Sequence, residues 1–194
     1  MTLNVVVVYG SQRNAREGIK AAKFIINELK KRNHVVELVD AKEYNLPILD
    51  KMYKEYERGK APEKLQKIHD LFESADCFVI VTGEYNHSMP PGLTNILDYF
   101  QSEYVFKPSA ILSYSAGSFG GVRSAVHLRA FLAELGMSSI PTTLPVGKVQ
   151  EFLEDGSPND QRYYSRAENF IKELEWYADA LKSKRKNDWL PNKN

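Results

Sequence analysis

The first stretch whose residue types suggest chemistry is Gly10-Ser-Gln-Arg-Asn-Ala-Arg16, which directly follows the apolar segment Asn4–Tyr9. An apolar run without polar alternation predicts a fully buried strand. We expect the loop to open a helix, whose first N–H groups lack internal partners and attract an anion. Ser11 would cap this helix, and Arg13 and Arg16 would lie on neighbouring helical positions facing a phosphate. From these residues alone, two solvated arginines are the alternative.

A second loop rich in turn-forming residues runs from Gly83 to Gly92, after the apolar segment 76–82. Two adjacent prolines, Pro90 and Pro91, stiffen its exit. The polar and aromatic residues that it presents are Glu84, Tyr85, Asn86 and His87. A solvated turn is the alternative, but such strong turn chemistry at a strand end favours a binding loop.

The third loop is Ser115-Ala-Gly-Ser-Phe-Gly-Gly121, which follows the apolar segment 108–115. Its three glycines allow backbone N–H groups to face a flat polar ring edge, although a tight turn explains them as well. The order of residues is not the Gly-x-Ser-x-Gly of a hydrolase nucleophile. The first loop has neither Gly-x-Gly-x-x-Gly nor a closing Gly-Lys-Ser/Thr, which argues against a Rossmann-type dehydrogenase and an ATPase.

The rest of the chain shows which elements must position these loops. Apolar segments at 4–9, 34–39, 76–82, 108–115 and 138–146 alternate with helical segments, the last at about 160–184. This alternation predicts a parallel sheet with helices on both faces. Right-handed crossovers favour a doubly wound, flavodoxin-like α/β fold with five strands in the order 2-1-3-4-5. The three loops then meet at the carboxyl edge of the sheet, and we expect residues 1–194 to form a single domain.

Composition excludes several classes of function. The 26 Lys and Arg against 25 Asp and Glu give a net charge of +1, which suggests neither a nucleic-acid nor an anionic-membrane partner. The single cysteine, Cys77, lies in an apolar run; we expect it to be buried and inert, and we predict no metal site. No apolar run approaches the roughly 20 residues of a membrane span, and no secretory-signal pattern follows Met1. We therefore expect a cytoplasmic protein.

Three motifs in this order give a more specific prediction. They are Gly10-Ser11-x-Arg13-x-x-Arg16, Glu84-Tyr85-Asn86-His87-Ser88-x-Pro90-x-x-Leu93-x-Asn95-x-x-Asp98, and Ser115-x-Gly117-x-x-Gly120-Gly121. Over roughly residues 1–150 the chain resembles the NADPH-dependent FMN reductase family, which includes flavodoxin-like quinone, azo-dye and chromate reductases. Gly83 departs from the proline that this family often has before Glu-Tyr-Asn, and we expect it to loosen the entry of the second loop.

The resemblance implies a non-covalently bound FMN. By matching position, Ser11, Arg13 and Arg16 would hold its phosphate. The second loop, through the backbone of Glu84, Tyr85, Asn86 and His87, would meet the isoalloxazine near N5. The residues that would line the pyrimidine edge of the ring are Ser115, Ala116, Gly117, Gly120 and Gly121.

The resemblance also implies an enzyme. Hydride would pass from NADPH or NADH through FMN to FMN, a quinone or a similar small acceptor, in ping-pong order. The flavin N5 would do the chemistry, so no catalytic residue is predicted in the protein. Family members are commonly homodimers or homotetramers, and the aromatic-rich segment 93–106 is the expected partner surface, with ordinary core as its alternative.

Two other functions stay open. A flavodoxin-like electron carrier or an FMN-binding redox-sensing module would share the fold and the cofactor. Electron carriers of this kind are often strongly acidic, and their phosphate loop is rich in Ser and Thr and lacks arginine. The net charge of +1 therefore favours the reductase. A flavin-free regulatory domain of the response-regulator kind would need acidic residues at the end of the first strand, where Tyr9-Gly10-Ser11 stands.

Overall fold

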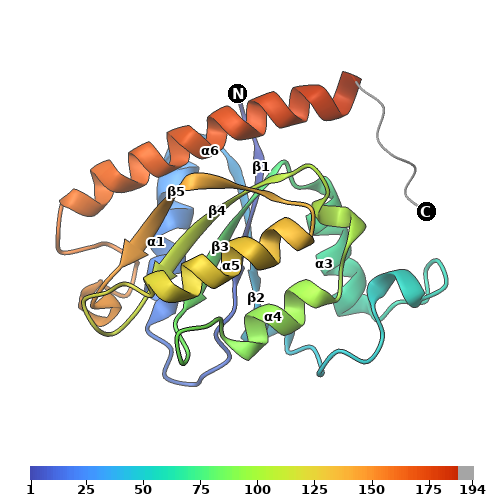
Figure 1. Ribbon diagram of the computed structural model, residues 1–194, viewed down its shortest axis with the longest axis horizontal. Helices are drawn as coiled ribbons and strands as arrows, with labels where there is room; N and C mark the ends of the chain where they lie inside the picture. Colours follow the sequence, from blue (N-terminus) through green and yellow to red (C-terminus); the bar gives the residue numbers. More distant parts are fainter. Residues whose placement is uncertain (188–194) are drawn as a thin grey trace.

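A five-stranded parallel sheet organises the computed structural model, which describes residues 1–187 (Figure 1). Its strand order is β2-β1-β3-β4-β5, with every neighbouring pair parallel, which confirms the predicted doubly wound topology. The strands are β1 Asn4–Tyr9, β2 Val35–Asp40, β3 Cys77–Gly83, β4 Pro108–Tyr114 and β5 Ser138–Val146. The helices are α1 Gly18–Lys31, α2 Ala41–Tyr44, α3 Glu63–Ser74, α4 Pro91–Asp98, α5 Val122–Glu134 and α6 Arg162–Asn187, with short 3-10 turns η1 Tyr53–Glu55, η2 Ser102–Tyr104 and η3 Val149–Glu151.

Helices cover both faces of the sheet, as predicted (Figure 1). α1 and α6 pack on the face that receives Val5, Val7 and Tyr9 from β1. α3, α4 and α5 pack on the face that receives Val6 and Val8. Because β1 is buried on both sides, successive residues of this strand are all apolar and no polar alternation is seen.

The edges of the sheet follow local chemistry. Pro141 and Pro145 lie in β5, at the edge of the sheet. An edge strand tolerates proline because it pairs with a neighbour on one side only, so the missing backbone N–H need not break the sheet. Cys77 is fully buried at the start of β3, which confirms its predicted burial, and burial raises the pKa of its thiol. None of the helices within residues 1–187 has the length and apolar character that crossing a membrane requires.

The terminal helix α6 is tied to the amino ends of β1 and β2. The Glu175 carboxylate accepts hydrogen bonds from the Arg32 guanidinium at 2.6 and 2.7 Å. The same carboxylate lies 2.8 Å from Nε2 of His34, whose Nδ1 accepts from the Leu3 N–H. Burial raises the pKa of Glu175, but its bonds to Arg32 and His34 outweigh burial and bring it below its usual value. These contacts hold the later part of α6 at the amino ends of β1 and β2, whereas its first turns reach the carboxyl end of β5, where Arg166 donates to the Pro145 carbonyl at 3.0 Å.

The aromatic segment 93–106 belongs mainly to the core. Tyr99, Phe100 and Tyr104 are 4%, 1% and 0% exposed, and they pack beneath α3 and α4. Only Phe106, at 43%, is substantially exposed among these aromatics. The prediction that these aromatic residues form a partner surface is therefore wrong for three of the four. Their side chains pack in the hydrophobic core between the sheet and α3 and α4.

Two aromatic residues of α6 give a matched test of this packing. Phe170 is fully buried against the sheet, whereas Trp176 is 68% exposed on the same helix. We expect Phe170→Ala to lower the free energy of unfolding by about 3–5 kcal/mol, because it leaves a cavity. Trp176→Ala should change it by about 0.5 kcal/mol or less. Urea unfolding followed by circular dichroism measures both, and equal losses would contradict this placement of α6.

Candidate functional site

The loop between β1 and α1 is irregular from Gly10 to Glu17, and α1 begins only at Gly18. Glu17 is the N-cap, with no side-chain cap hydrogen bond. The predictions that Arg13 and Arg16 occupy helical positions and that Ser11 caps the helix are therefore wrong. The first residue of α1 packs closely against Tyr114 at the end of β4. A Cβ at Gly18 would lie 2.1 Å from Cζ of Tyr114, so only glycine fits at this position.

Arg16 braces this loop against the neighbouring strand. Its Nη1 donates to the carboxylate of Asp40, at the end of β2, and to the carbonyl of Ser11 at 3.0 Å. Its guanidinium also lies 5.2 Å from the ring centroid of Tyr9. Burial lowers the pKa of Arg16, but its hydrogen bond to the Asp40 carboxylate more than compensates and raises the pKa overall. The Arg16 side chain is only 11% exposed, so its first partner is a carboxylate of this chain.

Arg13 differs from Arg16 in every one of these respects. Its side chain is exposed, and it makes no hydrogen bond or ion pair within residues 1–187. A guanidinium at the carboxyl edge of a parallel sheet without a protein partner is free to bind an anion. The phosphate role of Arg13 stays a prediction, and the geometry leaves this arginine available for it.

The second loop folds into a tight two-residue turn. Tyr85 and Ser88 exchange two backbone hydrogen bonds of 2.9 Å each. Asn86 and His87 lie between them with φ of +50° and +64°, as in a type I′ turn. Two successive non-glycine residues with positive φ carry backbone strain, which in proteins concentrates at functional sites. The loop therefore presents its polar backbone groups in a fixed arrangement.

The second and third loops are joined by one carboxylate. Glu84 accepts a hydrogen bond from the backbone N–H of Arg123, in the first turn of α5, at 3.1 Å. It accepts another from the guanidinium of the same residue at 3.2 Å. Because α5 has no side-chain cap from its own N-cap residue, Glu84 satisfies an otherwise unpaired N–H of this helix. Its side chain is thus occupied by the protein, which leaves its backbone for a ligand.

The third loop is held open by its own serine. Ser115 Oγ donates to the carbonyl of Gly117 at 2.8 Å and accepts from the N–H of Gly120 at 2.9 Å. Gly120 and Gly121 have φ of +66° and +70°, and a Cβ at Gly121 would lie 2.6 Å from the Tyr114 carbonyl. At Gly117 a Cβ would meet nothing within 4 Å. Ala116 and Gly117 therefore form an exposed backbone strip, and a surface cleft of about 400 Å³ opens beside Ser118.

The first two loops also touch each other directly. A Cβ at Gly10 would lie 2.2 Å from Cβ of Leu93, and one at Gly92 would lie 2.7 Å from the Gly10 carbonyl. Glycine is required at both positions because the backbones approach so closely. Asn95, one turn into α4, donates to the Pro47 carbonyl at 2.7 Å and so anchors the long connection after β2. The structure thus brings the three predicted loops together at the carboxyl ends of β1, β3 and β4.

Two buried tyrosines beneath these loops are not marked by the sequence motifs. Tyr9 ends β1 and Tyr114 ends β4, with ring centroids 6.1 Å apart. Tyr114 lies against both Gly18 and Gly83, and a Cβ at Gly83 would be 2.9 Å from its hydroxyl. The expectation that Gly83 loosens the second loop is therefore wrong: this glycine ends β3 and makes room for Tyr114. The only sequence signal was a tyrosine at the end of two apolar runs.

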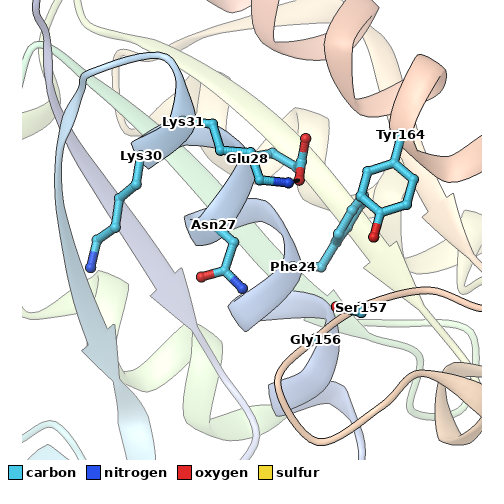
Figure 2. Close-up of a pocket in the computed structure, with 8 residues that line it drawn as sticks. All are labelled: Phe24, Asn27, Glu28, Lys30, Lys31, Gly156, Ser157 and Tyr164. Atoms are coloured by element: carbon cyan, nitrogen blue, oxygen red, sulfur yellow. Dashed lines mark hydrogen bonds and ion pairs between the residues drawn. The ribbon is translucent and has the colours of Figure 1, made fainter.

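A surface pocket of about 450 Å³ lies away from the three loops, between α1 and the chain before and within α6 (Figure 2). Figure 2 shows the Lys31 ammonium turned toward Glu28, at 2.6 Å. Phe24 packs edge-on against Tyr164 at a centroid distance of 5.6 Å. Since the Lys31 charge is already paired and the aromatic rings pack on each other, we assign this pocket to the contact between α1 and α6.

Comparison with known proteins decides the family. The sequence pattern of the NADPH-dependent FMN reductase family matches residues 3–151, which is more than half of the chain. The chain belongs to the NADPH-dependent FMN reductase family. This membership confirms the predictions of an NAD(P)H-dependent FMN and quinone reductase and of FMN as its cofactor, and it favours none of the alternative functions.

Curated relatives and solved structures agree with membership of the FMN reductase family. An NADPH azoreductase from Bacillus sp. (strain OY1-2) is 28% identical over 95% of this chain and 97% of its own. A quinone reductase from Pseudomonas putida is 30% identical over 81% and 86%. Two solved structures, FerB, an NAD(P)H:(acceptor) oxidoreductase from Paracoccus denitrificans, and an apo NADH:FMN oxidoreductase, give TM-scores of 0.69 and 0.71. FerB is 23% identical to this chain, and the match covers 89% of this chain and 97% of FerB. The apo enzyme is 20% identical, and the match covers 100% of this chain and 97% of the apo enzyme. At these identities the likeness shows the fold alone.

Residues 1–187 contain no group of three or more His, Cys, Asp or Glu side chains arranged to hold a metal ion. The polar groups at the carboxyl edge are instead a free arginine, hydroxyls and loop backbone. These groups are suited to a phosphate and a flat ring.

Two glycines of the third loop provide a matched test of its geometry. Gly121→Ala forces a Cβ against the Tyr114 carbonyl at positive φ, and we expect it to lower stability by about 1–3 kcal/mol. Gly117→Ala points a methyl group into open space and should cost about 0.5 kcal/mol or less. Thermal unfolding of the two variants and the wild type makes the comparison. Equal destabilisation would contradict the described loop.

Proposed function

We propose that the three loops hold FMN and that the chain passes hydride from NADPH or NADH through it to a quinone, an azo compound or a similar small acceptor. The observation that carries this proposal is the contact among the loops after β1, β3 and β4 at one edge of the sheet, in a chain of this family. In open parallel sheets, ligands bind at that edge where the strand order reverses.

The described residues fit a phosphorylated flavin in three respects. Arg13 offers an exposed guanidinium with no protein partner. The Tyr9 hydroxyl is buried beneath the first loop without a hydrogen-bond partner, so a polar ligand would relieve it. Gly117 has open space where a side chain would stand, so a flat ring can approach its backbone.

We assign the phosphate to the first loop. Arg13 makes the principal charge-assisted contact, and Ser11 contributes its hydroxyl. Arg16 keeps its Nη1 on Asp40 and adds positive charge beside the phosphate. This division follows from the burial and pairing of Arg16 and the exposure of Arg13.

The ring lies between the second and third loops in this proposal. When bound, FMN accepts hydride from NAD(P)H and delivers electrons to the acceptor in a second half-reaction. The backbone of Glu84, Tyr85, Asn86 and His87 positions the ring, and the Glu84–Arg123 hydrogen bonds keep the two loops at a fixed separation. The backbone N–H groups of Ala116, Gly117 and Gly121 would donate to the polar edge of the ring and stabilise negative charge there. Ser115 and Gly120, whose N–H groups donate to the Val146 carbonyl and to Ser115 Oγ, would line this edge by shaping the loop.

We further infer that the chain acts as one flavin-binding domain within a homodimer or homotetramer of the cytoplasm. A single sheet carries all three loops, which supports the first point. For the second, Phe119 and Val126, 69% and 68% exposed at and after the third loop, are candidate contacts for a second copy. Light scattering of the purified protein measures the assembly.

The visible spectrum of the purified protein tests the proposed function. We expect flavin absorption after incubation with FMN and gel filtration, bleaching by NADPH under nitrogen, and recovery of colour when a quinone is added. Steady NADPH oxidation with the quinone and no partner protein would separate a reductase from an electron carrier. A protein that takes up no FMN would overturn the proposal.

Arg13→Ala tests the phosphate assignment. Loss of one charge-assisted hydrogen bond of about 1.5–3 kcal/mol should raise the Kd for FMN about tenfold to hundredfold. Arg58→Ala, which removes another exposed arginine, is the control and should leave the Kd unchanged. Titration of flavin fluorescence measures both. An Arg13→Ala variant that binds FMN as tightly as the wild type would refute the assignment.

A further inference from the structure

An orphaned hydroxyl lies beneath the first loop. Tyr9 is 0% exposed, and its hydroxyl makes no hydrogen bond with any described group. A buried donor without a partner is rare in folded proteins, and its presence usually indicates a ligand or water at that point. Burial raises the pKa of Tyr9, and the neighbouring hydroxyls of Tyr114 and Ser11 and the charge of Arg16 only partly offset it. Tyr9 therefore carries its proton at neutral pH and is a donor.

Two further hydroxyls converge on the same point. Tyr114 is 9% exposed and Ser11 is 2% exposed, and each lies close enough to Tyr9 to influence its ionisation. Burial raises the pKa of Tyr114 as well, so this residue is also protonated. The Tyr9 hydroxyl has no partner at full hydrogen-bond geometry within residues 1–187, although the Tyr114 and Ser11 hydroxyls lie near enough to act on its pKa as hydrogen-bonding neighbours. We call Tyr9, Ser11 and Tyr114 the hydroxyl triad.

The triad lies beside the start of α1 and beside the ion pair of Arg16 and Asp40. Tyr114 packs against Gly18, the first residue of α1, whose leading N–H groups have no partner in the helix. The Arg16 guanidinium lies over the Tyr9 ring. The glycines at positions 18 and 83 leave the space that the Tyr114 ring fills, so the backbone is shaped around this tyrosine. Three protonated hydroxyls with a cation beside them form a donor set for an anionic oxygen.

We propose that the hydroxyl triad is the inner part of the phosphate site, in which Tyr9 and Tyr114 join Ser11 in donating to one oxygen of a phosphate monoester. The inference rests on the proposed function, since the monoester is that of FMN. It adds two ligands that the sequence motifs do not contain. It also explains why an unpaired hydroxyl is tolerated in the core: the ligand supplies its acceptor.

Riboflavin separates this role from a general effect on the site, because it has the flavin ring but no phosphate. We expect Tyr9→Phe and Tyr114→Phe each to raise the Kd for FMN about tenfold or more, with the Kd for riboflavin unchanged within twofold. Tyr164→Phe, in the packing pocket of Figure 2, is the control and should change neither constant. Fluorescence titration of the flavin-free protein gives all values.

The stability of the flavin-free protein gives a second readout. Tyr9→Phe removes an unsatisfied buried hydroxyl and keeps the ring, so the Tm without flavin should stay equal or rise, while the increase in Tm on adding FMN should shrink. A Tyr9→Phe Kd for FMN within twofold of the wild type, or an equal change for riboflavin, would overturn the inference and would point to a bound water instead. A wild-type protein that binds neither flavin would refute the proposed function itself, which is a different outcome.

Discussion

The hydrogen-bonded pair of Arg16 and Asp40 is the interaction on which the candidate site depends. The loop from Gly10 to Glu17 is irregular, so no helical ladder fixes its course. A largely buried guanidinium that grips the last residue of β2 supplies that constraint from the neighbouring strand. Removal of Arg16 would leave the largely buried Asp40 carboxylate without its ion-pair partner, whereas removal of Asp40 would leave Arg16 with only the more distant Glu43. The pair therefore fixes both the loop and the direction in which its remaining donors point.

The pair also explains the division of work between the two arginines. Arg16 is paired with Asp40, so its charge is largely neutralised. Arg13 is exposed, and its guanidinium is the positive charge of the loop that remains available to a ligand. Beneath the loop, Tyr114 fills space that Gly18 and Gly83 provide, and the buried Tyr9 hydroxyl finds no partner in the described geometry. An unsatisfied buried hydroxyl costs about 1–3 kcal/mol. The site thus combines a rigid frame with unused donors, which is the arrangement that a tightly held anion requires.

Sequence patterns predict the fold well because burial on two faces dictates them. The uninterrupted apolar runs of β1 and β3 and the prolines of β5 follow directly from strand position, and right-handed crossovers between parallel strands favour the observed order. The details of the site depend on contacts distant in sequence. Asp40 lies 24 residues from Arg16, and the late start of α1 depends on Gly18 meeting Tyr114 from another strand. Neither contact leaves a local signal, so Arg16 resembled a ligand and the tyrosines resembled core.

The central claim is that the Gly10–Glu17 loop is a phosphate site and that the loops after β3 and β4 flank the attached ring. A crystal structure of the protein grown with excess FMN tests it most directly. The account predicts the phosphate within hydrogen-bonding distance of the Arg13 guanidinium and the Ser11 hydroxyl, with the ring beside Gly117. A flavin phosphate bound at another edge of the sheet, or a loop without flavin at saturating FMN, would contradict it.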